Sequence, residues 1–294
     1  MLLKRNQAVT LDSLLELDQI GSGVFVSRRL WGSPAAKNIF GGQLVGLGLA
    51  AAFRTVDQQY ISRSLHVQFL RQVVRGLQVE FRVQGLVSAC KIVTRTVLGY
   101  QDGQPVMQMV CNFMQHRVAE SDEPGYQKPM PDVPFPGAQA DCPFVLDPQG
   151  YPEGFPAKIW ATSLDHDHET PGPPRQTLWI ESPEASSRTA QNNQCILAMY
   201  SDVHFTRVIV RPFGIRIAPA SKCLRRIVSA DHHIWFHRAN SDCLLFDTHC
   251  PQLHGGRGIV QSQVYCRDGH LVATVVQEGR VDIDRGARLP KPKL

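Results

Sequence analysis

The segment Val228–His237 combines several side chains that can donate or accept protons. Small or polar residues alternate in it with large apolar ones, which predicts a β-strand. The polar groups are a hydroxyl, a carboxylate and three imidazoles: Ser229, Asp231, His232, His233 and His237. Each polar group that is buried needs a partner, so a strand that only filled a core would not carry so many. These side chains suit general acid–base chemistry. A half-exposed strand with a solvated face remains the alternative.

A second candidate site is the glycine pair Gly41–Gly42, which precedes the apolar run Leu44–Phe53. Bare backbone N–H groups at a helix N-terminus can bind an anion or a polarised carbonyl oxygen. The alternative is that both glycines only permit a tight turn. The spacing of Gly46 and Gly48 does not indicate dinucleotide binding, because the third glycine and the preceding strand of that motif are missing.

Hydrophobic periodicity predicts the elements that must position these groups. In the first half we expect helices over residues 11–21 and 42–56, and strands over 24–30, 64–71, 77–86, 92–98 and 106–114. The last two strands flank Gln101-Asp-Gly-Gln104, and Asp-Gly between alternating runs is a strong hairpin signal.

The second half of the chain repeats this order. We expect a helix over residues 194–205 and strands over 155–161, 228–237, 244–248, 259–265 and 271–276. An offset of 166 positions relates Gly103 to Gly269, His66 to His232, and Phe69 to Trp235. This common register predicts an α+β fold made of a duplicated unit, a helix followed by an antiparallel sheet.

Proline is concentrated between the two halves, where it indicates a linker or an irregular surface segment. The predicted organisation is therefore an N-terminal unit over residues 1–118, a linker over 119–155 and a C-terminal unit over 156–294. Asp165-His-Asp-His-Glu169 has the composition of a metal site. We favour a solvated loop and predict no metal ligands, because no nearby residues complete a coordination shell.

The overall composition narrows the functional classes. With 43% hydrophobic and 19% charged residues in 294, the chain is an ordinary globular protein. Its eight cysteines form no Cys-x-x-Cys pair, which favours reduced, buried thiols. No apolar run is long enough for a membrane span, and the N-terminus lacks the pattern of a secretory signal. The net charge of +5 suits a phosphate-bearing small ligand, and no basic block with interleaved aromatics indicates nucleic acid.

Six motifs together resemble those of the acyl-CoA thioesterase II family, which includes a bacterial enzyme and peroxisomal relatives. They are Phe40-Gly-Gly-Gln43, Ser64-Leu-His-x-x-Phe-Leu-Arg71, Tyr200-Ser-Asp202, Asp231-His-His-Ile-Trp-Phe-His237, Gly255-Gly-Arg-Gly258 and Val276-Gln-Glu-Gly279. They follow the family's order and extend over residues 11–284. The resemblance implies a double hot-dog fold and hydrolysis of acyl-CoA thioesters without a metal, a cofactor or a covalent intermediate.

The resemblance also implies a catalytic set in the second half. Asp202 would be the general base, and Ser229 and Gln277 would orient the attacking water. Backbone N–H groups at a helix start would face the oxyanion, with Gly42 and Gln43 as candidates. A base, a hydroxyl and an amide match what a thioester carbonyl requires. Individually, Asp202 could cap its helix, Ser229 could fill a small strand position, and Gln277 could satisfy a backbone group.

Further residues of the family motifs are expected near the substrate. These are His66, for which a structural hydrogen bond is the alternative role, and Arg257 and Gly258. Two segments depart from the family pattern, Val87–Lys91 and Thr206–Phe213, and both are expected to border the acyl channel. The departures put the preferred chain length in doubt. The second segment adds Arg207 and Arg211, which would meet a phosphate, a polar acyl group or water.

Two other functions remain open from the sequence. One is a biosynthetic thioesterase that releases or cyclises a specialised acyl chain, and the other is a non-catalytic acyl-CoA binding protein. The expected partners are the acyl-CoA substrate and further copies of the chain in a homodimer or homotetramer, because hot-dog units expose sheet edges. Pro292-Lys293-Leu294 resembles the peroxisomal address Ser-Lys-Leu, so we predict binding to an import receptor and a peroxisomal location, with the cytoplasm as the alternative.

Overall fold

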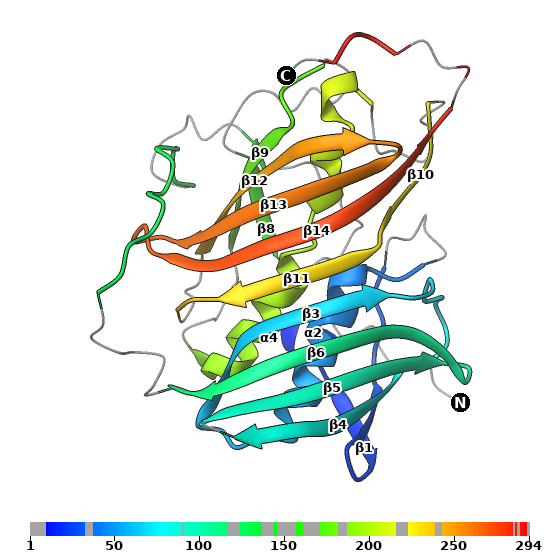
Figure 1. The fold of residues 1–294 in the computed structure, drawn as a ribbon, viewed down its shortest axis with the longest axis vertical. Helices are drawn as coiled ribbons and strands as arrows, with labels where there is room; N and C mark the ends of the chain where they lie inside the picture. The colour runs from blue at the N-terminus through cyan, green and yellow to red at the C-terminus, as the bar shows by residue number, and fades with distance from the viewer. Residues whose placement is uncertain are drawn as a thin grey trace, which may run out of the picture.

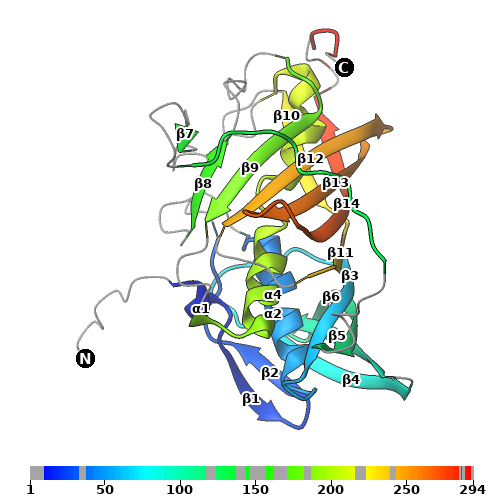
Figure 2. The same ribbon diagram turned by 90° about the vertical axis from the view of Figure 1, so that its left-hand side faces the viewer.

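A computed structural model describes residues 10–32, 38–89, 91–116, 124–136, 144–145, 157–161, 171–181, 187–215, 223–238, 243–284, 286 and 289–292. In these residues, one curved antiparallel sheet of 14 strands wraps two helices that lie side by side (Figures 1 and 2). The strand order is β1-β2-β4-β5-β6-β3-β11-β14-β13-β12-β9-β8-β7, and β10 also pairs with β14.

The elements of the first half are α1 (Leu11–Leu14), β1 (Leu17–Gly21), β2 (Val24–Ser27), α2 (Gly41–Phe53), β3 (Tyr60–Phe69), β4 (Glu80–Ala89), β5 (Ile92–Gln101) and β6 (Gln104–Gln115). Those of the second half are β7 (Phe144–Val145), β8 (Lys158–Ala161), β9 (Arg175–Glu181), α4 (Ala190–Tyr200), η2 (Phe205–Ile209), η3 (Arg211–Phe213), β10 (Leu224–Ser229), β11 (Asp231–Phe236), β12 (Cys243–His254), β13 (Arg257–Cys266) and β14 (Leu271–Ile283).

Helix α2 is buried on nearly every side, as its run of Ala, Gly and Leu predicts. Its glycines let α4 approach closely. A Cβ on Gly42 would lie 2.3 Å from the Met199 carbonyl oxygen, and a Cβ on Gly46 would lie 3.0 Å from the Cys195 carbonyl oxygen. The contact between the two helices therefore depends on the missing side chains.

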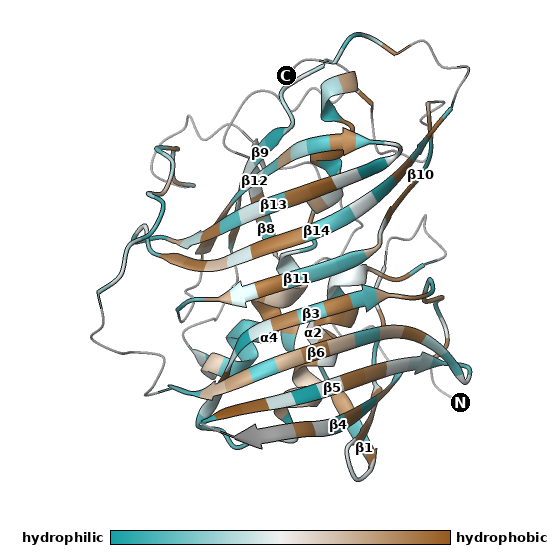
Figure 3. Cartoon of the chain, in the orientation of Figure 1, coloured by the Kyte–Doolittle hydropathy of each residue, from teal (hydrophilic) through white to brown (hydrophobic). Residues whose placement is uncertain are grey.

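The sheet has the symmetry of the predicted duplication. The order β2-β4-β5-β6-β3 in one half mirrors β9-β12-β13-β14-β11 in the other, and the halves join where β3 pairs with β11. Hydrophobic and hydrophilic bands alternate along the central strands (Figure 3), because one face packs on the helices and the other faces outward. The double hot-dog fold is thus present as one continuous sheet.

The register of the duplication differs from the predicted one in the joining strands. His66 pairs directly with His233, and both side chains lie on the outer face, opposite to buried Val67 and Ile234. His232 points inward, so it is not the counterpart of His66. The residue of β11 that corresponds to His66 of β3 is His233, which lies 167 positions later rather than the predicted 166. The Asp-Gly turns keep the predicted offset, with Gly103 and Gly269 both at positive φ.

Three predicted elements differ from the structure. The helix expected over residues 11–21 ends at Leu14, and β1 begins at Leu17. The helix expected to reach Phe205 ends at Tyr200, where turns begin. The single strand expected over residues 228–237 is two strands, β10 and β11, separated at Ala230.

Residues 124–136 of the predicted linker pass over the outer face of the second half (Figure 2). Met130, Val133 and Phe135 pack there on a cluster that includes Trp179 and Tyr265. The predicted unit boundaries, the oligomeric state and the import signal stay predictions. Residues 165–169 and the last two residues of the C-terminal tripeptide lie outside the described part of the chain.

Candidate active site

A cavity of about 500 Å³ opens where the start of α2, the end of β3, the turn after α4 and strand β10 meet. Both halves of the chain contribute to its wall. Part of the lining is apolar: Ile39, Phe40, Leu44, Phe69, Val73 and Ile227. Five of the remaining residues are charged or carry a hydroxyl: Arg71, Asp202, Thr206, Arg226 and Ser229. The cavity therefore combines apolar side chains with polar and charged ones, as a site for an amphipathic small molecule requires.

Asp202 lies two residues beyond the end of α4 and faces this cavity. Its carboxylate accepts hydrogen bonds from the Gly42 backbone N–H and, over 3.0 Å, from the Gln277 side-chain amide. Burial raises the pKa of Asp202 to about 6, although both hydrogen bonds oppose this rise. The group is then largely ionised near neutral pH and basic enough to take a proton from water.

Ser229 reaches the same cavity because of the interruption between β10 and β11. In an unbroken strand, Ser229 and His232 would face opposite sides of the sheet, since side chains alternate. The pairing with β14 shifts by one residue at Ala230, which is the pattern of a β-bulge. Asp231 stabilises this bulge, because its carboxylate accepts a hydrogen bond of 2.7 Å from the Glu278 backbone N–H. Ser229 and His232 consequently share the inner side.

Gln277 connects the two cavity residues. It lies on the inner face of β14 beside buried Val275 and has no exposed surface. Its side-chain amide donates to the Asp202 carboxylate and also to the Ser229 hydroxyl. The three residues that the family resemblance selected thus form one hydrogen-bonded group, in which Asp202 and Ser229 face the cavity and Gln277 lies behind them.

Behind Gln277 lies His232, which the sequence analysis grouped with the acid–base side chains of its segment without giving it a role of its own. His232 is completely buried, with Nδ1 2.9 Å from Gln277 Oε1 and Nε2 2.7 Å from Ser201 Oγ. Burial lowers the pKa of His232 to about 4, so the ring is neutral near pH 7. The available sequence signal was its place in the Asp231-His-His motif. Its inward direction follows from the register of β11, which sequence alone does not reveal.

The structure places the predicted oxyanion donors in other contacts. The Gly42 N–H donates to Asp202, and the Gln43 N–H bonds to the Phe40 carbonyl over 3.2 Å. The Gln43 side chain is buried and ties the start of α2 to the preceding segments. Its oxygen accepts from the Trp31 N–H, and its amide nitrogen donates to the Leu14 and Arg29 carbonyls. Gly41, the first residue of α2, lines the cavity instead.

His66, Arg257 and Gly258 do not line the described cavity. His66 lies on the outer face of the sheet, with its Nδ1 2.7 Å from Nδ1 of His233. Arg257 forms an ion pair with Glu278, and Gly258 packs against Ile209. The structure therefore separates these three from Asp202, and their predicted contact with substrate has no support in this geometry.

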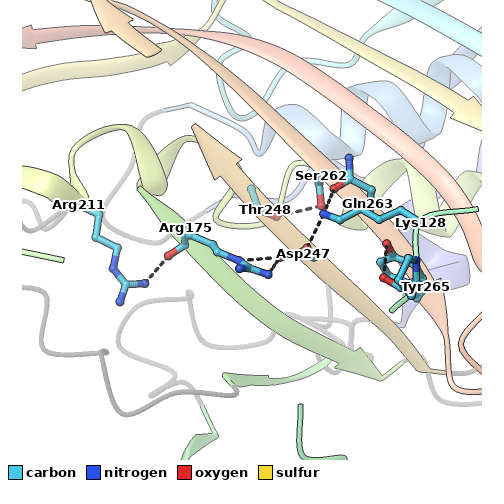
Figure 4. A network of polar contacts seen from close by, with 9 residues as sticks. Lys128, Arg175, Arg211, Asp247, Thr248, Ser262, Gln263 and Tyr265 are labelled. Atoms are coloured by element: carbon cyan, nitrogen blue, oxygen red, sulfur yellow. Dashed lines mark hydrogen bonds and ion pairs between the residues drawn. The ribbon is translucent and has the colours of Figure 1, made fainter. Parts of the chain in front are cut away.

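Arg211 also lies in a separate network (Figure 4). It donates over 2.7 Å to the carbonyl of Arg175, whose guanidinium in turn binds the buried Asp247 carboxylate. Lys128 of the linker segment reaches the same carboxylate over 3.4 Å. This network connects η3, β9, β12 and residues 124–136. Neither Arg211 nor Arg207 lines the cavity.

The described residues contain no group of three or more His, Cys, Asp or Glu side chains that could hold a metal ion. Nor does this part of the chain contain a helix that is long and apolar enough to cross a membrane.

Comparison with known proteins identifies the family of this chain. Family profiles described as the acyl-CoA thioesterase N-terminal and C-terminal domains match residues 28–114 and 127–281. Acyl-coenzyme A thioesterase 8 of Homo sapiens is 27% identical, over 94% of this chain and 90% of that protein. Acyl-CoA thioesterase 2 of Haemophilus influenzae is 26% identical, over 83% of this chain and 88% of that protein.

A solved structure shares the fold. The acyl-CoA thioesterase II TesB2 of Mycobacterium marinum superimposes with a TM-score of 0.71 at 25% identity, covering 95% of this chain and 99% of that chain. The double hot-dog architecture predicted from the sequence is confirmed. On these matches, the chain belongs to the acyl-CoA thioesterase II family, whose reaction is the hydrolysis of acyl-CoA thioesters.

Proposed function

We propose that this chain hydrolyses acyl-CoA thioesters with a water molecule that Asp202 activates and Ser229 orients. The observation that carries the proposal is the shared amide of Gln277, which donates to both side chains at the wall of one cavity. A base and a hydroxyl held at fixed positions beside apolar side chains suit thioester hydrolysis.

In the first step, the Asp202 carboxylate takes a proton from water while the water oxygen attacks the thioester carbonyl carbon. Ser229 holds that water through a hydrogen bond. A pKa near 6 suits this role, because the carboxylate is ionised at neutral pH and still accepts a proton more readily than an ordinary aspartate. Gln277 keeps the carboxylate in place without touching the substrate.

The carbonyl oxygen becomes an oxyanion in the tetrahedral intermediate. The N-terminus of α2 lies beside Asp202, and Gly41 is the residue of its first turn that lines the cavity. The partial positive charge of the helix start stabilises a negative oxygen there. The intermediate then collapses, the carbon–sulfur bond breaks, and the proton held by Asp202 passes to the CoA thiolate.

The cavity wall offers the substrate two kinds of contact, apolar side chains and charged guanidinium groups. Apolar side chains such as Phe40, Phe69 and Val73 suit the acyl chain or the pantetheine arm. Arg71 and Arg226 are exposed, line the same cavity, and form no ion pair within the part of the chain that the structure describes. Guanidinium groups bind phosphates well, so these two arginines would hold the phosphates of CoA.

The proposal is tested by thiol release from acyl-CoAs with short, medium, long and branched chains, comparing the wild type with Asp202→Asn. Asp282→Asn, an exposed residue outside the cavity lining, serves as the control. Turnover that collapses only in Asp202→Asn would support the hydrolase. Turnover of a single chain type would favour the biosynthetic thioesterase. Binding of acyl-CoA without any turnover would favour the binding protein.

A further inference from the structure

The buried ring of His232 lies between two side chains, and each of them can make only a few hydrogen bonds. On one side is the Gln277 side-chain carbonyl, 2.9 Å from Nδ1, and on the other is the Ser201 hydroxyl, 2.7 Å from Nε2. The hydroxyl of Ser201, the residue that follows α4, also lies 2.8 Å from the carbonyl of Ala198 in the last turn of that helix, to which it can donate. Because His232 has no exposed surface, no solvent water can replace a hydrogen bond that is lost when the ring proton is on the wrong nitrogen.

Counting hydrogens determines the direction of these bonds. The Gln277 amide nitrogen directs its two hydrogens to Asp202 and Ser229, which leaves Oε1 as an acceptor only. Nδ1 of His232 must then carry the ring proton. Nε2 is consequently an acceptor and takes the single hydrogen of the Ser201 hydroxyl, which then no longer donates to the Ala198 carbonyl. The chain of donors runs from Ser201 through His232 and Gln277 to the Asp202 carboxylate.

The opposite tautomer would reverse the chain. With the proton on Nε2, the ring would donate to Ser201, whose hydrogen would pass to the Ala198 carbonyl. The Nδ1 lone pair would then face Gln277, and the amide would have to turn its nitrogen toward the ring. That rotation would direct the Gln277 oxygen at the Asp202 carboxylate, where two acceptors repel each other. The tautomer of His232 and the orientation of Gln277 are therefore coupled.

We infer that His232 is a positioning residue, which holds the Gln277 amide in the orientation that fixes Asp202 and Ser229, with the Ser201 hydroxyl as the partner of its other ring nitrogen. The inference rests on the proposed function, because it gives Gln277 its role in the same site. His232 itself does not line the cavity. Its neutral state agrees with this role, since burial holds its pKa at about 4.

The tautomer can be measured without any assay of activity. In the full-length protein labelled with ¹⁵N histidine, two-bond proton–nitrogen correlation spectra distinguish a protonated from an unprotonated ring nitrogen. His232→Asn identifies the signals of His232 by their loss. We expect the proton on Nδ1 at neutral pH. A proton on Nε2 would overturn the inference.

Kinetics of two variants separate positioning from packing. The side-chain nitrogen of His232→Asn can take the place of Nδ1 and still donate to Gln277, whereas His232→Leu fills the space without a donor. We expect His232→Leu to lower kcat about a hundredfold with KM within about twofold, and His232→Asn to retain kcat within about tenfold. Equal kcat values in both variants would overturn the inference, and if His232→Leu does not fold, the spectrum decides.

These outcomes are distinguishable from a failure of the proposed function. If Asp202→Asn is inactive and the ring proton is on Nε2, the hydrolase stands and the positioning role fails. If Asp202→Asn is fully active, the proposed function fails whatever the spectrum shows.

Discussion

The Gly42 backbone N–H donates to the Asp202 carboxylate and so joins the two halves of the chain at one group. Gly42 belongs to the first turn of α2, and Asp202 follows the end of α4. The neighbouring Gly41 also lies close to this carboxylate, because a Cβ built on Gly41 would lie 2.9 Å from Asp202 Oδ2. The position of the candidate base thus depends on two adjacent glycines.

Alanine substitutions at these glycines should therefore have different effects. Gly41→Ala meets the movable end of a side chain, so we expect near-normal stability and a kcat lowered about tenfold by displacement of the carboxylate. Gly42→Ala meets the Met199 backbone at 2.3 Å, so we expect a loss of stability of about 1–3 kcal/mol. Thermal unfolding and steady-state kinetics of both variants test this contrast. Equal stability losses would show that the local packing differs from the one described.

The Ser229 hydroxyl should be required independently of side-chain size. Ser229→Ala removes the group that orients the water, and we expect kcat to fall about a hundredfold. Ser229→Thr keeps a hydroxyl, and its extra methyl group can extend toward the cavity, so most activity should remain. Steady-state kinetics on one acyl-CoA checks both variants. Full activity of Ser229→Ala would remove Ser229 from the mechanism.

The raised pKa of Asp202 also predicts a dependence of stability on pH. The ordinary pKa of 3.8 rises to about 6 in the folded protein, so the folded state binds more protons between these values. The protonated carboxyl group therefore contributes to the free energy of unfolding. This contribution is fully present below pH 3.8 and is lost as the pH rises through about 6. The total loss is up to about 3 kcal/mol, at 1.36 kcal/mol per pKa unit.

Asp202→Asn cannot lose this proton. The unfolding free energy of the variant, minus that of the wild type, should therefore increase by up to about 3 kcal/mol between about pH 4 and about pH 8. Denaturant unfolding at several pH values measures the change. A difference independent of pH would mean that the pKa of Asp202 is not raised.

The arginines at the cavity mouth should discriminate between substrates with and without phosphates. Arg71→Ala and Arg226→Ala should each raise KM for an acyl-CoA by about three- to tenfold, as expected for a charge-assisted contact. Neither should change KM for the corresponding acyl thioester of N-acetylcysteamine, which has no phosphate. Arg225, which precedes Arg226 on β10, pairs with Asp284 and provides the matched control. Equal effects on both substrates would show that these arginines do not bind phosphate.

Much of the fold could be predicted from local sequence, and the differences have local causes. The Asp102-Gly103 turn was predictable because both residues take positive φ, which few residue types adopt easily. The strand that follows Leu14 was not predictable, because Leu15 and Leu17 fit both a helical and an extended pattern. The expected helix over residues 11–21 was wrong for that reason.

The site was predictable in its residue types but not in its geometry. The family motifs selected Asp202, Ser229 and Gln277, which the structure brings together. The bulge at Ala230 that directs Ser229 inward is held by a hydrogen bond between Asp231 and Glu278, 47 positions apart. Sequence periodicity does not contain such a contact. The role of His232 was missed for the same reason, since its direction depends on the register of β11 with β3 and β14.

The central claim is that Asp202 is the base that activates water. The most direct test is the pH dependence of kcat/KM for the wild type beside Asp202→Asn. For the wild type, we predict an increase with pH that follows the loss of one proton with a pKa of about 6. Asp202→Asn should be slower by at least about a hundredfold and lack this transition. The same transition and a similar rate in the variant would contradict the account.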